Sequence, residues 1–339
     1  MMKAVGYLQS LTIEDAHSLL DIELPEPLIG ERDLLVEVHA ISVNPVDTKV
    51  RKNQQPPTGE YKVLGWDAVG IVKAVGSKVT LFQPNDRVWY AGALSRSGSN
   101  RERQVVDERI VGRMTKTLDF AEAAALPLTS VTAWEMLFER LGVAEGQTNL
   151  GQTLLIVGAA GGVGSILTQL ARQLTGLTVI GTASRPETMD WVKQLGAHHV
   201  IDHGQPLSEE LKRIGIPEVT FVASLNQTDQ HFTEIAASIA PQGRLALIDD
   251  PLLPLDIKLL KRKSISLHWE YMFTRSFFET PDMIEQHHIL NRVADLIDQG
   301  VLKTTFGEHF GKINAENLRR AHAFIESGKA KGKIVLEGF

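Results

Sequence analysis

The residues whose types and spacing most clearly suggest chemistry form one glycine-rich segment, 153–164, which reads TLLIVGAAGGVG. An apolar run is followed by closely spaced glycines and then by a helical pattern, which is the order strand, tight turn, helix. Glycines let the backbone approach a pyrophosphate, and the start of the next helix offers unpaired N–H groups and a positive dipole end. The segment predicts a dinucleotide site, with a purely structural turn as the alternative. Its expected ligand backbone is Ala160, Gly161, Gly162, Val163 and Gly164.

The end of the next expected strand indicates which nicotinamide cofactor is used. An acidic side chain at that position would bind the ribose 2′-hydroxyl of NAD and repel a 2′-phosphate. Here the strand is followed by Ser184 and Arg185, and no carboxylate occurs before Glu187. A guanidinium forms charge-assisted bonds to phosphate, and the serine adds a hydroxyl donor. The pattern favours NADPH, although Arg185 also simply precedes Pro186 at the start of a helix.

The bulk composition excludes several classes of protein. The chain has 339 residues, 43% of them hydrophobic, a formal net charge of −6 and no cysteine. There is no basic run suited to nucleic acid or an anionic membrane, and no apolar run as long as the roughly 18 residues of a membrane span. Disulfides, thiolate catalysis and cysteine-bound zinc are excluded. With no signal-peptide pattern in MMKAVGYLQS, we expect a cytoplasmic enzyme with a small-molecule substrate.

The periodicity along the chain predicts two domains of the α/β class. Residues up to about 127 are β-rich, with strand patterns at 34–40 and 86–90 and a strand pair at 68–76. From 153 to 249 apolar strand runs alternate with helical patterns, which predicts a doubly wound parallel sheet. Helices are expected at 280–299 and 315–327, and a closing strand at 333–336. We therefore expect a catalytic domain of residues 1–127 and 265–339, interrupted by a nucleotide-binding domain of residues 128–264.

Several short segments carry a resemblance to a known family: Val43-Asn44-Pro45-Val46-Asp47, Gly65-Trp66-Asp67-Ala68-Val69-Gly70, Val75-Gly76, Asp86-Arg87-Val88, Ala124-Ala125-Leu126-Pro127, Thr132-Ala133-Trp134 and the glycine turn. In this order they resemble the medium-chain dehydrogenase/reductase superfamily. The chain is most similar to its quinone oxidoreductase branch and to the subgroup labelled zinc-type alcohol dehydrogenase-like. The resemblance implies a GroES-like catalytic domain, a Rossmann domain, a cleft between them, hydride transfer and a homodimer.

The zinc ligands of that superfamily are missing from this sequence. Zinc-dependent members hold the metal with a cysteine, a Gly-His-Glu segment and a further cysteine or acid. This chain has Asn44 at the first position, Trp66 in place of the histidine, and Leu128 and Thr129 around the third. Tryptophan cannot ligate, and one carboxylate does not hold Zn²⁺ against water. We expect a zinc-free enzyme and regard a hard-cation site at Asp47 and Asp67 as the weaker alternative.

Without a metal, hydride addition is easiest to an acceptor that delocalises the incoming charge. Quinones and α,β-unsaturated carbonyls do this, and the protein then supplies positioning and hydrogen-bond donors. The leading hypothesis is NADPH-dependent, zinc-independent reduction of such an acceptor. The alternatives are an alcohol dehydrogenase or aldehyde reductase of the zinc-type family and a nucleotide-sensing or RNA-binding protein without turnover. The absence of a basic patch argues against RNA.

The resemblance also suggests individual site residues. Asn44 is expected to donate to a substrate carbonyl or to cap an Asn-Pro turn, Trp66 to line the cleft or to lie in the core, and Tyr271 to supply a proton. Thr129 and Thr132 either contact the nicotinamide ribose or its phosphate or cap a helix. The expected catalytic residues are Asn44, Asp47, Trp66 and Tyr271; the further cofactor residues are Thr129, Thr132, Leu225, Asn226, Ile248 and Lys333.

Overall fold

A computed structural model describes all residues 1–339, and the chain divides into two compact units. Unit 1 contains Met1–Val131 and Phe273–Phe339, and unit 2 contains Thr132–Met272. The expected boundary at 264/265 falls before a strand at Ser266–Trp269 that belongs to the sheet of unit 2. The return to unit 1 therefore comes later in the chain than the sequence pattern suggested.

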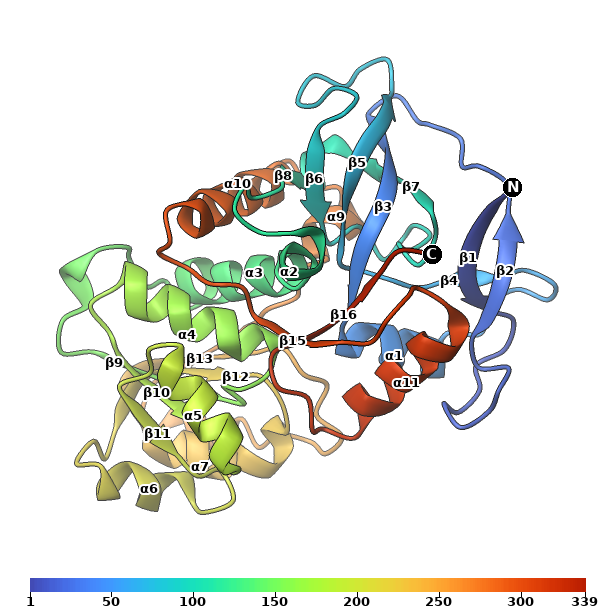
Figure 1. The fold of residues 1–339 in the computed structure, drawn as a ribbon. Helices are drawn as coiled ribbons and strands as arrows, with labels where there is room; N and C mark the ends of the chain where they lie inside the picture. Colours follow the sequence, from blue (N-terminus) through green and yellow to red (C-terminus); the bar gives the residue numbers. More distant parts are fainter. The chain divides into compact units, whose positions relative to one another are not determined.

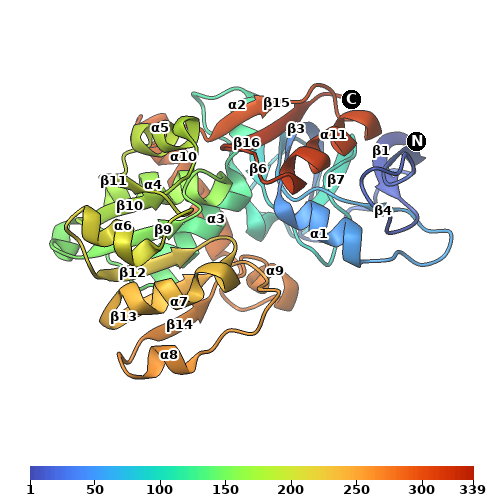
Figure 2. The same cartoon turned by 90° about the horizontal axis from the view of Figure 1, so that it is seen from below.

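Unit 2 is built on one parallel sheet of six strands. The strands are β9 (Thr153–Val157), β10 (Thr178–Thr182), β11 (His199–Ile201), β12 (Val219–Ser224), β13 (Ile239–Leu247) and β14 (Ser266–Trp269). Their order is β11-β10-β9-β12-β13-β14, with β14 at one edge (Figure 2). All neighbours pair in parallel, so the chain winds outward first to one side of β9 and then to the other. This is the expected doubly wound arrangement.

Helices alternate with these strands, because each apolar strand run is followed by an amphipathic segment. They are α4 (Gly162–Leu174), α5 (Pro186–Gln194), α6 (Leu207–Arg213), α7 (Thr228–Ser238) and the short α8 (Lys258–Lys261). Leu154, Leu155 and Ile156 of β9 are completely buried, as expected for a central strand covered on both faces. A π-helical stretch, η2 (Glu135–Arg140), and a 3₁₀ turn, η3 (Gln147–Asn149), precede β9.

Unit 1 contains a seven-stranded sheet and a three-stranded sheet. The larger has the order β15-β16-β3-β5-β6-β8, with β7 also paired to β3, and the smaller has the order β2-β1-β4. The strands are β1 (Met2–Tyr7), β2 (Leu20–Leu24), β3 (Asp33–Val43), β4 (Lys62–Val63), β5 (Ala68–Val75), β6 (Arg87–Tyr90), β7 (Arg103–Asp107), β8 (Val111–Arg113), β15 (Phe306–His309) and β16 (Lys333–Glu337). The strand pair expected at 68–76 is wrong: β5 is one continuous strand, because Gly70 lies against the backbone of β3 and makes no turn.

The helices of unit 1 include one that the sequence analysis did not anticipate, α1 (Pro45–Asn53). Asn44 is its N-cap, Pro45 sets its first turn, and the Asp47 carboxylate accepts the Asn44 backbone N–H at 2.8 Å. The others are η1 (Glu108–Ile110), α2 (Phe120–Ala124), α3 (Pro127–Trp134, which runs into unit 2), α9 (Thr274–Phe278), α10 (Glu285–Asp298) and α11 (Ala315–Glu326).

The C-terminal segment closes unit 1 by pairing with its central strand. β16 lies antiparallel to β3, with Ile334 opposite Val43, and α11 packs beside α1 although the two are distant in sequence (Figure 1). This pairing brings the Gly332-Lys333 turn next to Asn44. No helix of the structure is both long and apolar enough to cross a membrane.

Candidate functional site

The glycine turn of unit 2 has the geometry of a phosphate cradle. Gly158 follows β9 with φ at +85°, a conformation that side chains disfavour. A Cβ added to Gly164 would lie 2.5 Å from the Gly158 carbonyl oxygen, so this glycine permits close helix–strand packing. At Gly161, the N-cap of α4, an added Cβ would meet only that carbonyl, at 3.7 Å, so the turn is open there. The predicted ligands Ala160, Gly161, Gly162, Val163 and Gly164 thus form the strand–helix turn required for a pyrophosphate.

The turn lies where the winding of the sheet reverses. β10 and β12 flank β9 on opposite sides, and ligands of such sheets bind beyond the strand ends at this point. Asn226, just after β12, places its amide oxygen 2.5 Å from where a Gly158 Cβ would stand. The Leu225 N–H donates to Val157 at 3.1 Å, and the Ile248 N–H donates to Ser224 at 3.3 Å. The three predicted residues Leu225, Asn226 and Ile248 therefore do end neighbouring strands at one edge.

The end of β10 carries the residues predicted to select NADPH. Ser184 is exposed, and Arg185 is the N-cap of α5. This position is compatible both with a phosphate-binding arginine and with an arginine that simply precedes the helix. Its guanidinium lies 3.3 Å from the Glu187 carboxylate, and both side chains are partly exposed. Because the Arg185 side chain is 38% exposed, a phosphate can approach its guanidinium.

His203 also lies next to this site, although no motif in the sequence singled it out. Its Nδ1 lies 3.0 Å from the Thr182 hydroxyl, which also accepts the Gly158 N–H at 3.0 Å. Burial lowers the pKa of the imidazole. The one available signal was position, since His203 follows β11 at the same sheet edge at which Ser184 follows β10.

Unit 1 contains a buried polar cluster centred on Lys333 and Asp67. The Lys333 Nζ donates to the Val43 carbonyl at 3.2 Å, to Asp67 Oδ2 at 3.1 Å and to the Asn44 amide oxygen. Asp67 also accepts from the Ser42 hydroxyl at 2.9 Å and from the Leu128 N–H at 3.0 Å. All these side chains are nearly inaccessible to solvent.

The hydrogen-bond count shows which protonation state this cluster holds. Three acceptors around one nitrogen require the three N–H donors of an ammonium, and a carboxylate that accepts four donors is ionised. Burial lowers the pKa of Lys333 and raises the pKa of Asp67, while the attraction between the two groups opposes both shifts. We therefore describe Lys333 and Asp67 as an ion pair whose desolvation is offset by complete hydrogen bonding.

Asp47 lies beside this pair but is not part of it. Its Oδ2 caps α1, whereas its buried Oδ1 has no hydrogen-bond partner. Burial raises the pKa of Asp47 to about 7, against the lowering effect of the Asn44 N–H and of Lys333. Asp47 is thus a buried carboxyl group whose pKa is raised from the usual range of aspartate.

The polar groups of three predicted site residues are engaged within unit 1 in this structure. Asn44 cannot donate to a substrate here, because its amide nitrogen donates to Asp67 at 3.1 Å and to the Trp66 carbonyl at 3.3 Å. Trp66 is 1% exposed and belongs to the core, where it donates to the Ala93 carbonyl and meets Phe273 edge-on. Lys333 has all three N–H groups engaged within unit 1, so it has none left for a cofactor phosphate. Contacts with residues distant in sequence therefore occupy the polar groups of Asn44, Trp66 and Lys333.

The remaining candidates differ in accessibility. Tyr271 is half exposed, and burial of the rest of its ring and the nearby Asp250 raise the pKa of its phenol. Thr129 is buried, and its hydroxyl donates to the Leu126 carbonyl at 3.1 Å. Thr132, on the same helix, is also buried.

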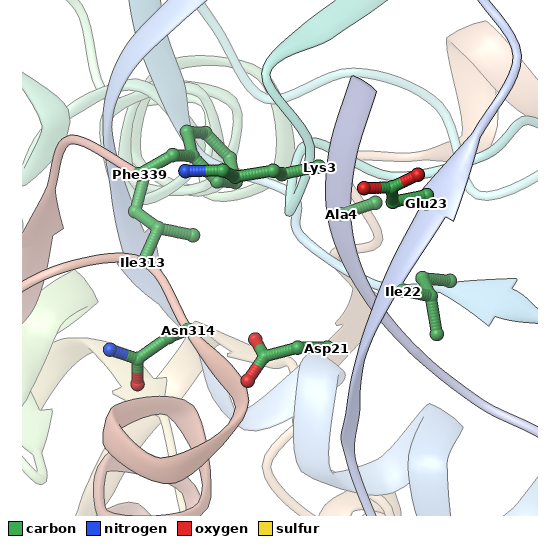
Figure 3. Close-up of a pocket in the computed structure, with 8 residues that line it drawn as sticks. All are labelled: Lys3, Ala4, Asp21, Ile22, Glu23, Ile313, Asn314 and Phe339. Carbon is green, nitrogen blue, oxygen red and sulfur yellow. The ribbon is translucent and has the colours of Figure 1, made fainter. Parts of the chain in front are cut away.

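A hollow of about 450 Å³ lies elsewhere in unit 1, between the β1–β2 hairpin and the C-terminus (Figure 3). Its walls include the aliphatic side chains of Ile22 and Ile313, with Asp21 and Asn314 at one end. Asp21 is already used, because its carboxylate accepts the Ala315 N–H at 2.8 Å. None of the predicted site residues lines this hollow.

Comparison with known proteins identifies the family of the chain. Residues 30–132 match the alcohol dehydrogenase GroES-like domain, and residues 195–336 match the zinc-binding dehydrogenase model. The chain is 39% identical over 336 residues to a zinc-type alcohol dehydrogenase-like protein of Staphylococcus aureus strain MRSA252, with 99% of each chain covered. The chain belongs to the medium-chain dehydrogenase/reductase superfamily.

Members of the superfamily share the whole fold with this chain. A structure from Rhizobium etli CFN 42, provisionally described as a zinc-dependent alcohol dehydrogenase, has a TM-score of 0.96 and 59% identity, with 100% of this chain and 98% of that one covered. A mycobacterial protein complexed with NADPH has a TM-score of 0.83 and 27% identity over 99% and 100%. A quinone oxidoreductase of Pseudomonas aeruginosa is 30% identical over 93% and 94%. The predicted GroES-like and Rossmann folds are confirmed, and the chain is an NAD(P)H-dependent oxidoreductase.

The zinc in some of these names does not suit the residues present. Asn44, Trp66 and Asp67 stand where zinc-dependent members of the superfamily have ligands, and the Asp67 carboxylate is saturated by four donors, one of them an ammonium. A divalent ion there would lie against a fixed positive charge. No group of three or more histidine, aspartate or glutamate side chains is placed to hold a metal ion.

Proposed function

We propose that this protein uses NADPH to reduce quinones or α,β-unsaturated carbonyls without a metal ion. The observation that carries the proposal is the Lys333–Asp67 ion pair. The resemblance implies that Asp67 stands where zinc-dependent members have a metal ligand. A zinc alcohol dehydrogenase needs that metal to stabilise an alkoxide. In this chain the Lys333 ammonium occupies the cluster instead. The substrate must therefore be one that delocalises the negative charge left by hydride addition.

The preference for NADPH rests on the end of β10. Arg185 supplies the cation for a 2′-phosphate, Ser184 supplies an exposed hydroxyl, and the nearest carboxylate, Glu187, is directed at Arg185. The mycobacterial relative that contains NADPH supports this choice. Bound NADPH would supply a hydride to the acceptor, whose carbonyl oxygen then takes up the displaced electron pair.

The chain's own groups supply binding and a proton. The α4 N-terminus holds the pyrophosphate, and the half-exposed Tyr271 phenol is the proposed proton donor to the resulting enolate or phenolate. Asp47 is proposed to tune the cluster, since it has one unpartnered oxygen and a pKa about 7. The quinone oxidoreductase of P. aeruginosa supports quinones as one acceptor class.

We further propose a cytoplasmic homodimer. β14 is an edge strand of the six-stranded sheet, and the outer side of such a strand offers unpaired N–H and C=O groups to a second copy. Light scattering of the purified chain tests the oligomeric state. A charged substitution at the exposed Trp269 should then shift the mass toward the monomer.

The decisive experiment is turnover by EDTA-treated protein with NADPH or NADH and a panel of quinones, enones, aldehydes and alcohols. We expect quinone or enone reduction that does not change on adding Zn²⁺. Arg185→Ala should weaken NADPH binding roughly tenfold or more, the loss of a charge-assisted bond of about 1.5–3 kcal/mol, and leave NADH unchanged. Arg213→Ala, an exposed arginine of the same unit, is the control. Activity restricted to alcohols or aldehydes and dependent on Zn²⁺ would refute the proposal.

A further inference from the structure

The Lys333 ammonium is bound in the way that proteins bind a small inorganic cation. Its three neighbours are a backbone carbonyl, an amide oxygen and a carboxylate: Val43 O at 3.2 Å, Asn44 Oδ1, and Asp67 Oδ2 at 3.1 Å. Lys333 is 3% exposed, and all three acceptors are oxygen atoms, the ligands of hard cations. We infer that the Lys333 ammonium is the resident cation of this cluster, a tethered substitute for a metal ion that positions Asn44 and Asp67.

The fold explains how the cation reaches this place. β16 pairs with the end of β3, so Ile334 lies opposite Val43 and Lys333 stands at the start of α1. Asp67 precedes β5 and also accepts the N–H of Leu128 in α3. One ion pair therefore joins the last strand of the chain to β3, α1 and α3. The inference rests on the same ion pair as the proposed function. The two can still be told apart, because rescue and metal binding report on the pair itself, whereas turnover reports on the acceptor.

The charge of Lys333 also determines the orientation of the Asn44 amide. Because the ammonium offers only donors, the amide oxygen faces Lys333, and the amide nitrogen faces Asp67 and the Trp66 carbonyl. Without the cation, Asp67 loses the charge that lowers its pKa, Asn44 has no reason to hold this orientation, and an oxygen-lined space remains. That space should accept a cation from solution.

Chemical rescue tests the first consequence. In Lys333→Ala we expect a clear fall in unfolding temperature, most of which methylammonium chloride should restore. Equal concentrations of NaCl or of tetramethylammonium chloride, which has no N–H donor, should restore much less. Lys329→Ala, an exposed lysine near the same turn, should show neither the loss nor the rescue. A Lys333→Ala protein as stable as wild type, or equal rescue by all three salts, would overturn the inference.

Metal binding tests the second consequence. Electron paramagnetic resonance of Mn²⁺ should show binding to Lys333→Ala at least tenfold tighter than to wild type. Adding Asp67→Asn should abolish that gain. Mn²⁺ binding to wild type that Asp67→Asn removes would contradict the inference, because the site would then be open to metal in the presence of Lys333.

A measurement on the wild-type protein covers the case in which Lys333→Ala does not fold. Nitrogen-15 NMR of the lysine side chains should show one slowly exchanging ammonium resonance, absent in Lys333→Arg. If every lysine ammonium exchanged its hydrogens rapidly with water, Lys333 would be neutral or solvated, and the inference would be wrong.

Discussion

The Nδ1 atom of His203 lies 3.0 Å from the hydroxyl oxygen of Thr182, and this hydroxyl also accepts the Gly158 N–H. The imidazole after β11 is thereby connected to the first glycine of the cofactor turn through one side chain. Because the hydroxyl already accepts a hydrogen bond, its own hydrogen is available to the neutral ring.

Thr182→Val should therefore loosen the turn. The isosteric change leaves the Gly158 N–H and the His203 nitrogen without this partner, at a cost of about 1–3 kcal/mol in unfolding free energy. Urea titration and NADPH fluorescence titration should both show the loss. Thr178→Val at the start of the same strand is the control, and equal effects of the two changes would argue against this connection.

Gly158→Ala should damage the turn more than backbone strain alone predicts. Positive φ costs an alanine about 1–2 kcal/mol, and the new methyl would also lie 2.5 Å from the Asn226 amide oxygen. Gly215→Ala provides the matched control, because Gly215 has φ of +78° and no atom within 4 Å of an added Cβ. We expect both variants to lose stability, but only Gly158→Ala to lose NADPH binding. Similar binding losses would contradict this account.

His322 should make the protein sensitive to mild acid. It is completely buried, its Nδ1 accepts the Arg51 Nε at 3.4 Å, and burial lowers its pKa to about 3. Between pH 6.5 and that value, the unfolded chain binds a proton that the folded chain does not, so stability falls as pH falls, by up to about 1.4 kcal/mol per pH unit. Urea unfolding from pH 7.5 to pH 5 should show a shallower slope for His322→Asn. The exposed His288 serves as control through His288→Asn.

Glu270 should contribute the opposite dependence. Glu270 and Glu135 are both buried beside one guanidinium, with Arg140 Nε 3.0 Å from Glu270 and an Arg140 terminal nitrogen 3.7 Å from Glu135. Burial and the Glu135 charge raise the pKa of Glu270. The folded chain then holds a proton that the unfolded chain releases, so stability is lost as pH rises above the ordinary glutamate pKa. Calorimetry should show that the stability of Glu270→Gln relative to wild type is higher at pH 9 than at pH 5, with the variant more stable than wild type at pH 9. A stability difference that does not change with pH would be evidence against a protonated Glu270.

Local pattern alone was sufficient for the glycine turn and the strand–helix alternation of the nucleotide-binding unit, but not for its C-terminal boundary. An apolar strand, closely spaced glycines and an amphipathic helix specify their turn within a few residues, so Gly158 to Gly164 and the alternation around them could be predicted. The residue types after β10 were likewise enough to predict from the sequence that Arg185 favours NADPH. The strand pair at 68–76 could not be judged correctly, because only contact with β3 shows that Gly70 is needed for close packing.

The roles in the buried cluster depended on tertiary structure. Lys333 and Asp67 are 266 positions apart, and no periodicity links them. Sequence identified Asn44 as a donor because an amide has N–H groups, but the fold directs those groups to Asp67 and Trp66. The chemistry of a polar side chain depends on its hydrogen-bond partners, and folding decides which partners from distant strands lie beside it. The absence of zinc-binding residue types, in contrast, can be read from the sequence itself.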